Sequence, residues 1–296
     1  MTTTDQENAR GVVYVAFGAP YLLQALHSIA TLRRHNPDLP VLVVCNTPAP
    51  DPLPQGLAPC RFRQVEAPNA RNREFKSSAH RLSPFARTLF LDCDTEIKGD
   101  LAQGFAFLDH ADIAIRPEPA PYAMSVTEAD PVEAERLTRI HGEFNTGVIF
   151  SRRSAAALRL LDLWHDHVCR NSARDQKHFV RALAACPEVT IRPLAAAWNY
   201  MRYDIRTHAR ESWLRHDPFV WHYMDYSYSP DALRGVWALA RETGQAQTLR
   251  NWPWIKRQVL RPYLTRYAGL KTIDKARMGL KRGLGRIVGR NSGRPR

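Results

Sequence analysis

The chain has 296 residues, 44% of them hydrophobic, which suffices for one large α/β domain or for a domain with an appendage. No run of about 18 apolar residues occurs, and MTTTDQENAR lacks the basic and apolar regions of a signal peptide, so we expect neither a transmembrane helix nor export. The five cysteines form no CxxC pair and lie mostly in apolar segments, which is typical of free thiols in a reducing compartment. The expected location is the cytoplasm.

The net charge of +13 belongs to the C-terminal end of the chain. Residues 250–296 contain 14 Lys and Arg and one acid, whereas the remainder holds 28 basic and 28 acidic residues. Recognition of nucleic acid requires a basic face with interleaved aromatic side chains. The neutral globular part therefore argues against nucleic acid as a partner, and a nucleic-acid-binding protein acting through its tail is kept only as an alternative.

The predicted elements alternate between strands and helices. Val12–Phe17 reads as a strand, an apolar helical stripe follows over 22–30, and Val41–Cys45 is a second strand, which together form a βαβ unit. Further strands are expected at 61–66, 88–91, 112–116, 147–150, 189–193 and 218–222, further helices at 75–82, 131–141, 157–168 and 175–185, and a proline-rich surface loop at 116–122. This order predicts a doubly wound α/β domain with a mostly parallel sheet over residues 10–230 and a basic helical extension over 231–296.

Two acids in an Asp-x-Asp pattern, Asp92 and Asp94, directly follow the apolar strand at 88–91. Ligands of open α/β sheets bind beyond the carboxyl ends of such strands. Two carboxylates at that edge are costly unless a positive group neutralises them, and Mg²⁺ or Mn²⁺ does so while bridging phosphates. The alternative is a pair of solvated turn residues.

Other polar residues stand beside predicted strand and helix ends. Lys76 precedes the acidic strand and either contacts a phosphate or is a solvated lysine. Asn145 and Gly147 stand at the start of a predicted strand, where they either bind sugar hydroxyls or form an ordinary turn. Asp175 opens a helix, where capping alone explains an acid. His222 ends a strand and is either a metal ligand or a structural histidine.

Taken in order along the chain, these segments resemble the GT-A fold nucleotide-diphospho-sugar glycosyltransferases, in particular the glycogenin-like and galactosyltransferase-like enzymes and their bacterial relatives. The resemblance covers about residues 10–225. It rests on Lys76, Ser83-Pro84-Phe85, Leu91-Asp92-Cys93-Asp94, Phe144-Asn145-Thr146-Gly147, Asp175-Gln176, Trp198-Asn199 and Val220-Trp221-His222.

The resemblance implies a role for each matching residue. Asp92 and Asp94 would chelate Mn²⁺ or Mg²⁺ on the donor diphosphate, with His222 as the third ligand. Lys76 would contact donor phosphate or sugar. The donor sugar would be lined by Asn145, Gly147, Asp175 and Gln176, with Asp175 or Gln176 as the catalytic residue nearest the anomeric carbon, and the base and ribose would lie against Ala16, Phe17 and Gly18. That first turn carries no acidic or Asn residue, a departure that leaves the nucleotide open.

The expected function is that of a metal-dependent glycosyltransferase that moves a sugar from a nucleotide-diphosphate donor to a glycan or lipid-linked acceptor with retention of configuration. A nucleotidyltransferase making a nucleotide-sugar is the alternative, although no Gly-rich basic phosphate loop follows the first strand. The basic, aromatic tail suits an anionic membrane surface, which favours peripheral attachment to the inner face of the membrane. The alternative is a disordered basic tail, because Gly279, Gly283, Gly285 and Gly289 weaken any helix there.

Overall fold

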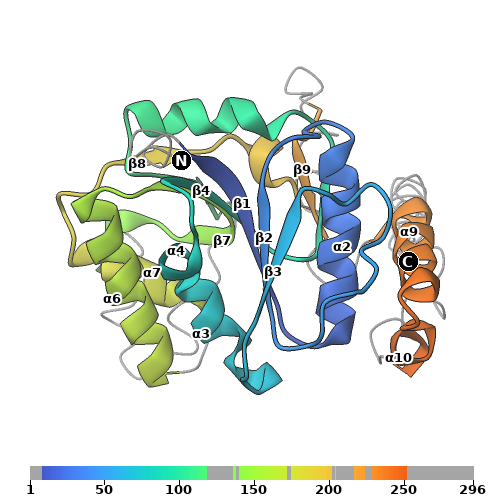
Figure 1. The fold of residues 1–296 in the computed structure, drawn as a ribbon. Coiled ribbons are helices and arrows are strands. Elements are labelled where there is room, and N and C mark those ends of the chain that lie inside the picture. Colours follow the sequence, from blue (N-terminus) through green and yellow to red (C-terminus); the bar gives the residue numbers. More distant parts are fainter. Residues whose placement is uncertain are drawn as a thin grey trace, which may run out of the picture.

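The computed structural model describes residues 9–118, 136–137, 140–171, 175–201, 204, 217–223 and 228–251. Its centre is a seven-stranded sheet of order β3-β2-β1-β4-β7-β6-β8, beside a two-stranded sheet β5-β9 (Figure 1). The strands are β1 (Arg10–Ala16), β2 (Val41–Cys45), β3 (Cys60–Gln64), β4 (Arg87–Leu91), β5 (Thr95–Ile97), β6 (Ile113–Pro117), β7 (Phe144–Arg152), β8 (Ile191–Pro193) and β9 (Val220–His222). The helices are α2 (Ala19–Arg33), α3 (Asn72–Ser77), α4 (Ala79–Leu82), α6 (Ala155–Asn171), α7 (Asp175–Ala184), α9 (Pro230–Glu242) and α10 (Ala246–Asn251), with 3₁₀ helices η1 (Asn69–Arg71), η2 (Leu101–Asp109) and η4 (Ala196–Asn199).

The sheet is mostly parallel, as the sequence predicts, with one reversed strand in its middle. β3, β2, β1 and β4 run parallel to one another, and so do β6 and β8. β7 is antiparallel to both of its neighbours, β4 and β6. Its direction was not predicted, because a run buried on both faces looks the same whichever way the strand enters the sheet.

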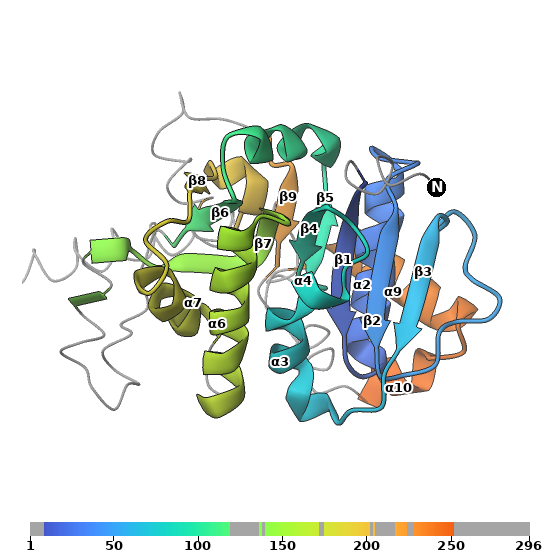
Figure 2. The same cartoon turned by 60° about the vertical axis from the view of Figure 1, so that its left-hand side comes forward.

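Helices cover both faces of this sheet. Alternate residues of β1 point to opposite sides, so that Tyr14 joins the core beneath α2 and Val15 joins the core beneath α6 and α7. On the second side the rings of Trp164 and Phe179 meet edge to face at 5.5 Å. Figure 2 shows α6 and α3 on one side of the strands and α9 and α10 beyond α2 on the other. The α/β architecture with helices on both faces is therefore confirmed.

α9 and α10 extend the core beyond α2, within the region expected to be a basic extension. Val236 and Ala240 of α9 are buried and belong to the same core as α2. The domain boundary at residue 230 stays a prediction, as does membrane docking, because residues 252–296 lie outside the described ones. The same holds for the proline-rich loop beyond residue 118 and for most of the helix expected over 131–141. In the parts that are described, no helix is both long and apolar enough to span a bilayer.

The helix expected over 75–82 is two short helices, α3 and α4, with Ser78 between them. Two serine hydroxyls compete with regular helix geometry here: the Ser77 hydroxyl donates to the carbonyl of Glu74 at 2.9 Å and the Ser78 hydroxyl to that of Phe75 at 3.1 Å. Such local side-chain bonds offer the backbone an alternative to the helical pattern. The break leaves Lys76 at the end of α3, facing the sheet edge.

A buried chain of hydroxyl groups ties the first strand to the turn after β4. Tyr14 Oη lies 2.9 Å from Ser28 Oγ, and Ser28 Oγ lies 2.8 Å from Thr95 Oγ1. The Thr95 hydroxyl donates its single proton to the carbonyl oxygen of Asp92 at 2.9 Å. Because that proton is used, Thr95 accepts from Ser28 and Ser28 accepts from Tyr14. These hydrogen bonds therefore fix the turn that carries Asp92 and Asp94 relative to β1 and α2.

Replacing Thr95 by Val should lower the free energy of unfolding by about 1–3 kcal/mol, since the fully buried Ser28 hydroxyl and the Asp92 carbonyl would each lose a partner. Tyr14→Phe removes only the terminal hydroxyl of the chain and should cost less. Urea unfolding of both variants measures this, and a Thr95→Val variant as stable as wild type would contradict the role given to the hydroxyl chain.

Candidate active site

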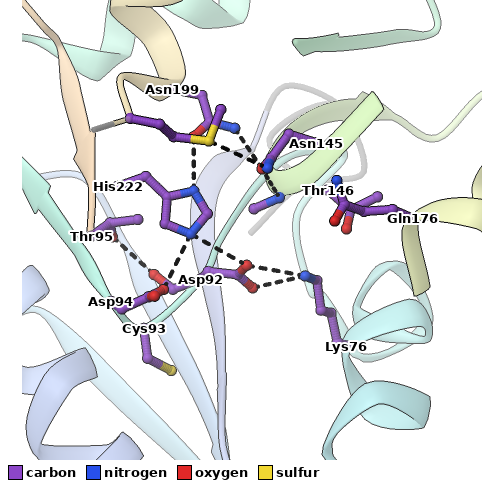
Figure 3. Close-up of polar contacts among 12 residues, drawn as sticks. Lys76, Asp92, Cys93, Asp94, Thr95, Asn145, Thr146, Gln176, Asn199 and His222 are labelled. Carbon is purple, nitrogen blue, oxygen red and sulfur yellow. Dashed lines mark hydrogen bonds and ion pairs between the residues drawn. The ribbon is translucent and has the colours of Figure 1, made fainter. Parts of the chain in front are cut away.

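Two carboxylates and an imidazole meet beyond the carboxyl end of β4. Asp92 and Asp94 follow that strand, and β5 then begins at Thr95, which lies opposite His222 in the antiparallel pair β5-β9. His222 Nε2 is 3.3 Å from Asp94 Oδ1 and 3.8 Å from Asp92 Oδ2 (Figure 3). One ligand atom from each of the three residues lies within 4.8 Å of the others. The three predicted metal ligands are thus brought together by strand pairing.

The chemistry of this group fits a divalent cation. Carboxylate oxygens are the ligands preferred by Mg²⁺ and Mn²⁺, and a neutral imidazole adds one nitrogen. Burial lowers the pKa of His222, but the carboxylates of Asp94 and Asp92 outweigh it and raise that pKa above its usual value. The acids thus attract positive charge to this point, whether a proton on the ring or a metal ion.

Lys76 lies on the other side of Asp92 and joins it to a third acid. Its Nζ is 3.0 Å from Asp92 Oδ1 and 2.9 Å from Asp175 Oδ2, and its side chain is 11% exposed. Burial opposes the charged form of Lys76, yet Asp175 and Asp92 raise its pKa above the usual value. The lysine is therefore a permanent cation at the sheet edge. The expected contact of Lys76 with donor phosphate or sugar stays a prediction, and the structure places its ammonium group between two carboxylates.

Asp175 is strongly ionised although only 13% of its side chain is exposed. Burial raises its pKa, but Lys76 and a hydrogen bond from Thr146, whose hydroxyl lies 2.6 Å from Asp175 Oδ2, lower the pKa to about 2. Burial also dominates at Asp92, where it raises the pKa despite Lys76 and His222. The two carboxylates that share Lys76 thus have pKa values shifted in opposite directions, and an added cation would stabilise the ionised form of Asp92 more than that of Asp175.

Gly147 permits the close approach of the His222 ring. A Cβ added at residue 147 would lie 2.3 Å from His222 Cε1, closer than any real side chain allows. The Gly147 amide donates to Asn145 Oδ1 at 3.0 Å. The sequence predicts close approach at this glycine, and the group that comes close in the structure is the imidazole.

The first βα turn offers mainly backbone. Ala16 and Phe17 are buried, and Gly18 has φ 88°, a left-handed conformation that requires glycine. The Gly18 amide donates to Asn46 Oδ1 at 2.7 Å, and Asn46 Nδ2 donates to Asn69 Oδ1 at 2.8 Å. The turn itself contains no Asn side chain, but Asn46, directly after β2, and Asn69, the first residue of η1, place carboxamide groups beside it. They could not be found from the sequence of the turn, because both residues come from other segments.

Gln176 lies next to Asn145 and apart from the Asp-Asp-His group. Its Nε2 donates to the carbonyl oxygen of Phe144 at 3.2 Å and to Glu118 Oε2 at 3.3 Å. The same Glu118 oxygen accepts from Asn145 Nδ2 at 3.2 Å. Glu118 is a site residue that sequence reasoning missed, because it lies in a proline-rich stretch that looks like an ordinary surface loop.

Comparison with solved structures places this fold among glycosyltransferases. Galactosyltransferase LgtC, in complex with donor and acceptor sugar analogues, matches with a TM-score of 0.50 at 16% identity, over 82% of this chain and 97% of LgtC. Mouse xyloside xylosyltransferase 1 in its apo form matches with a TM-score of 0.50 at 16% identity, over 72% and 97%. The bifunctional glycosyltransferase WbbM matches with a TM-score of 0.54 at 14% identity, over 81% of this chain and 52% of WbbM.

The expected GT-A fold is confirmed by these matches, which at such identities concern the fold alone. No protein-family model and no curated protein matches the sequence.

Because the folded-state pKa of Asp175 lies below its unfolded value of about 3.9, ionised Asp175 stabilises the fold above that pH, and this contribution is lost as the pH falls towards 2. The stability difference between wild type and Asp175→Asn should therefore shrink by about 2 kcal/mol between pH 6 and pH 2.5. Urea unfolding across this range measures it. Thr146→Val removes one donor and should give a smaller pH-dependent difference, whereas a constant difference for Asp175→Asn would contradict the assignment.

Proposed function

We propose that this protein is a metal-dependent glycosyltransferase that transfers a sugar from a nucleotide-diphosphate donor to a glycan or lipid-linked acceptor. The observation that carries the proposal is the group of Asp92, Asp94 and His222 at the ligand-binding edge of the sheet, within 4.8 Å of one another. The shared fold with LgtC, whose structure holds donor and acceptor sugar analogues, supports a nucleotide-sugar donor and a glycan acceptor.

Asp92, Asp94 and His222 are the residues that would hold Mn²⁺ or Mg²⁺. When bound, such an ion supplies Lewis-acid stabilisation of the charge on the departing diphosphate. Burial already raises the pKa of Asp92, so its ionised form is favoured by a second cation beside Lys76. A divalent ion would therefore offset the free-energy cost of keeping Asp92 ionised in the folded protein.

Lys76 adds positive charge on the side of Asp92 away from His222 (Figure 3). An oriented cation in a site sheltered from water stabilises developing negative charge without reorganisation. The ion pairs with Asp92 and Asp175 fix the direction of the ammonium group. We propose that Lys76 acts on the leaving diphosphate as a fixed point charge and orients both acids.

The properties of Asp175 favour retention of configuration. An inverting enzyme needs a base whose pKa lies near the working pH. Asp175, with a pKa of about 2 and with Lys76 and Thr146 on the same carboxylate oxygen, is a poor base. We propose that Asp175 stabilises positive charge developing at the anomeric carbon, and that Gln176, whose Nε2 is already bonded to Glu118 and Phe144, presents its amide oxygen to the sugar.

Transfer or donor hydrolysis should disappear with EDTA and return with Mn²⁺ or Mg²⁺. Asp94→Ala should lower the rate at least about 100-fold, in line with the loss of one group that stabilises the transition state. Asp38→Ala is the matched control and should keep wild-type activity, because Asp38 is an exposed turn residue before β2, at the sheet edge opposite to that of the Asp-Asp-His group.

The assay follows nucleoside diphosphate release from a panel of nucleotide-sugars. Release of pyrophosphate from a nucleoside triphosphate and a sugar phosphate would instead indicate a nucleotidyltransferase. Full turnover by the double variant Asp92→Ala, Asp94→Ala would contradict the proposal.

The stereochemical proposal predicts a product with the same anomeric configuration as the donor. One-dimensional proton NMR of the anomeric signal, recorded early in the reaction, decides between retention and inversion. Inversion would show that the roles given to Asp175 and Gln176 are wrong while leaving the metal-dependent transfer intact.

A further inference from the structure

His222 has two ring nitrogens, and one side chain determines which of them carries the proton. His222 Nδ1 lies 2.9 Å from Asn199 Oδ1, inside the protein, where both residues are at most 5% exposed. A carboxamide oxygen accepts a hydrogen bond and cannot donate one, so the proton belongs on Nδ1. In the neutral ring, Nε2 then has its lone pair directed at the side of Asp92 and Asp94.

The orientation of the Asn199 amide is itself determined by its neighbours. Asn199 Nδ2 donates to Asn145 Oδ1 at 2.9 Å. Asn145 cannot be turned around, because its oxygen accepts from the Gly147 backbone amide, which only donates, and its nitrogen donates to the Glu118 carboxylate. The Gly147 amide and the Glu118 carboxyl group thus set the direction of the hydrogen bonds that run from Asn145 through Asn199 to the imidazole. Figure 3 shows the part of this network from Asn145 to His222.

A buried ion pair holds Asn199 in place. Arg116 donates to the carbonyl oxygen of Asn199 and binds Asp204 through two hydrogen bonds of 2.6 and 2.7 Å, and both charged side chains are at most 6% exposed. The next residue, Tyr200, accepts from the His222 amide at 2.8 Å. Side chain and backbone therefore fix Asn199 relative to β9, on which His222 lies.

We propose that Asn199 is a positioning residue that holds His222 in its Nδ1-protonated tautomer, so that Nε2 is the nitrogen offered to a divalent cation. This rests on the proposed function for the identity of the ligand. Partners of this kind, which bind the far nitrogen of a metal-binding histidine, typically change metal affinity 10- to 100-fold when they are removed. The imidazole is left without an acceptor when Asn199 becomes apolar, and either tautomer is then available.

Two variants test this with two measurements. Asn199→Leu removes the acceptor at similar volume. Asn199→Asp loses the donor to Asn145 but keeps an acceptor for Nδ1, and it therefore serves as the conservative rescue of the tautomer. Long-range ¹⁵N–¹H NMR of the metal-free full-length protein, with His222 assigned by its loss in His222→Gln, reports the tautomer at the alkaline end of a pH series. Mn²⁺ titration followed by EPR gives the metal affinity, and circular dichroism checks the fold.

Wild type and Asn199→Asp should show the Nδ1-protonated ring, whereas Asn199→Leu should show a mixed or reversed tautomer and bind Mn²⁺ about 10- to 100-fold more weakly. A Leu variant with wild-type tautomer or wild-type Mn²⁺ affinity overturns the proposal, and so does an Asp variant as impaired as the Leu variant. If Asn199→Leu is misfolded, the Asp variant decides by the same two measurements. Wild-type protein that binds no Mn²⁺ would refute the proposed function, while the tautomer in the variants still decides the role of Asn199.

Discussion

The structure depends on the neutralisation of partly buried negative charge at one edge of the sheet. Asp92, Asp94 and Asp175 converge there, facing the Lys76 ammonium group and the His222 imidazole, whose pKa these acids raise. Removing one member of a buried ion pair is strongly destabilising, because its partner remains charged and desolvated. The charged groups come from α3, the turn after β4, α7 and β9, so each of these elements is held in position by electrostatics as well as by its apolar face.

The reversed strand β7 explains how polar side chains reach that edge. Because β7 is antiparallel to β4, it begins where β4 ends, with Val148 opposite Leu91 and the Gly147 carbonyl accepting from the Asp92 amide at 2.8 Å. The first residues of β7, which carry the amide of Asn145 and the hydroxyl of Thr146, therefore lie beside the Asp-x-Asp turn. A parallel strand would have placed the same residues at the opposite edge. Parallel strands contribute residues to this site only from their carboxyl ends. The reversed strand β7 also contributes residues from its amino end, which adds a hydrogen-bonding segment to the site.

The sequence predicts the parts of this site that depend on local patterns. The apolar runs of β1, β2 and β4 and the acids after β4 are visible because buried strands and their polar ends differ sharply in composition. The short strand β5 and its pairing with β9 are not, since three residues carry too little periodicity, and this pairing is what brings His222 to the acids. The roles of Asn199 and Asn46 also escape prediction, because an asparagine looks alike in a turn and in a hydrogen-bonded network.

The residue between the two acids bears on which metals the proposed site would retain. Cys93 turns away from Asp92 and Asp94 and donates its thiol proton to the carbonyl oxygen of Val15 at 3.2 Å. Burial raises the pKa of Cys93 well above its usual value, which disfavours the soft thiolate that zinc or copper would bind. A cysteine stands at the centre of the motif, yet its sulfur is hidden under the first strand. Such an arrangement leaves the oxygen atoms of Asp92 and Asp94, and not the sulfur between them, to meet the proposed hard divalent cation, and it keeps the sulfur from oxidants.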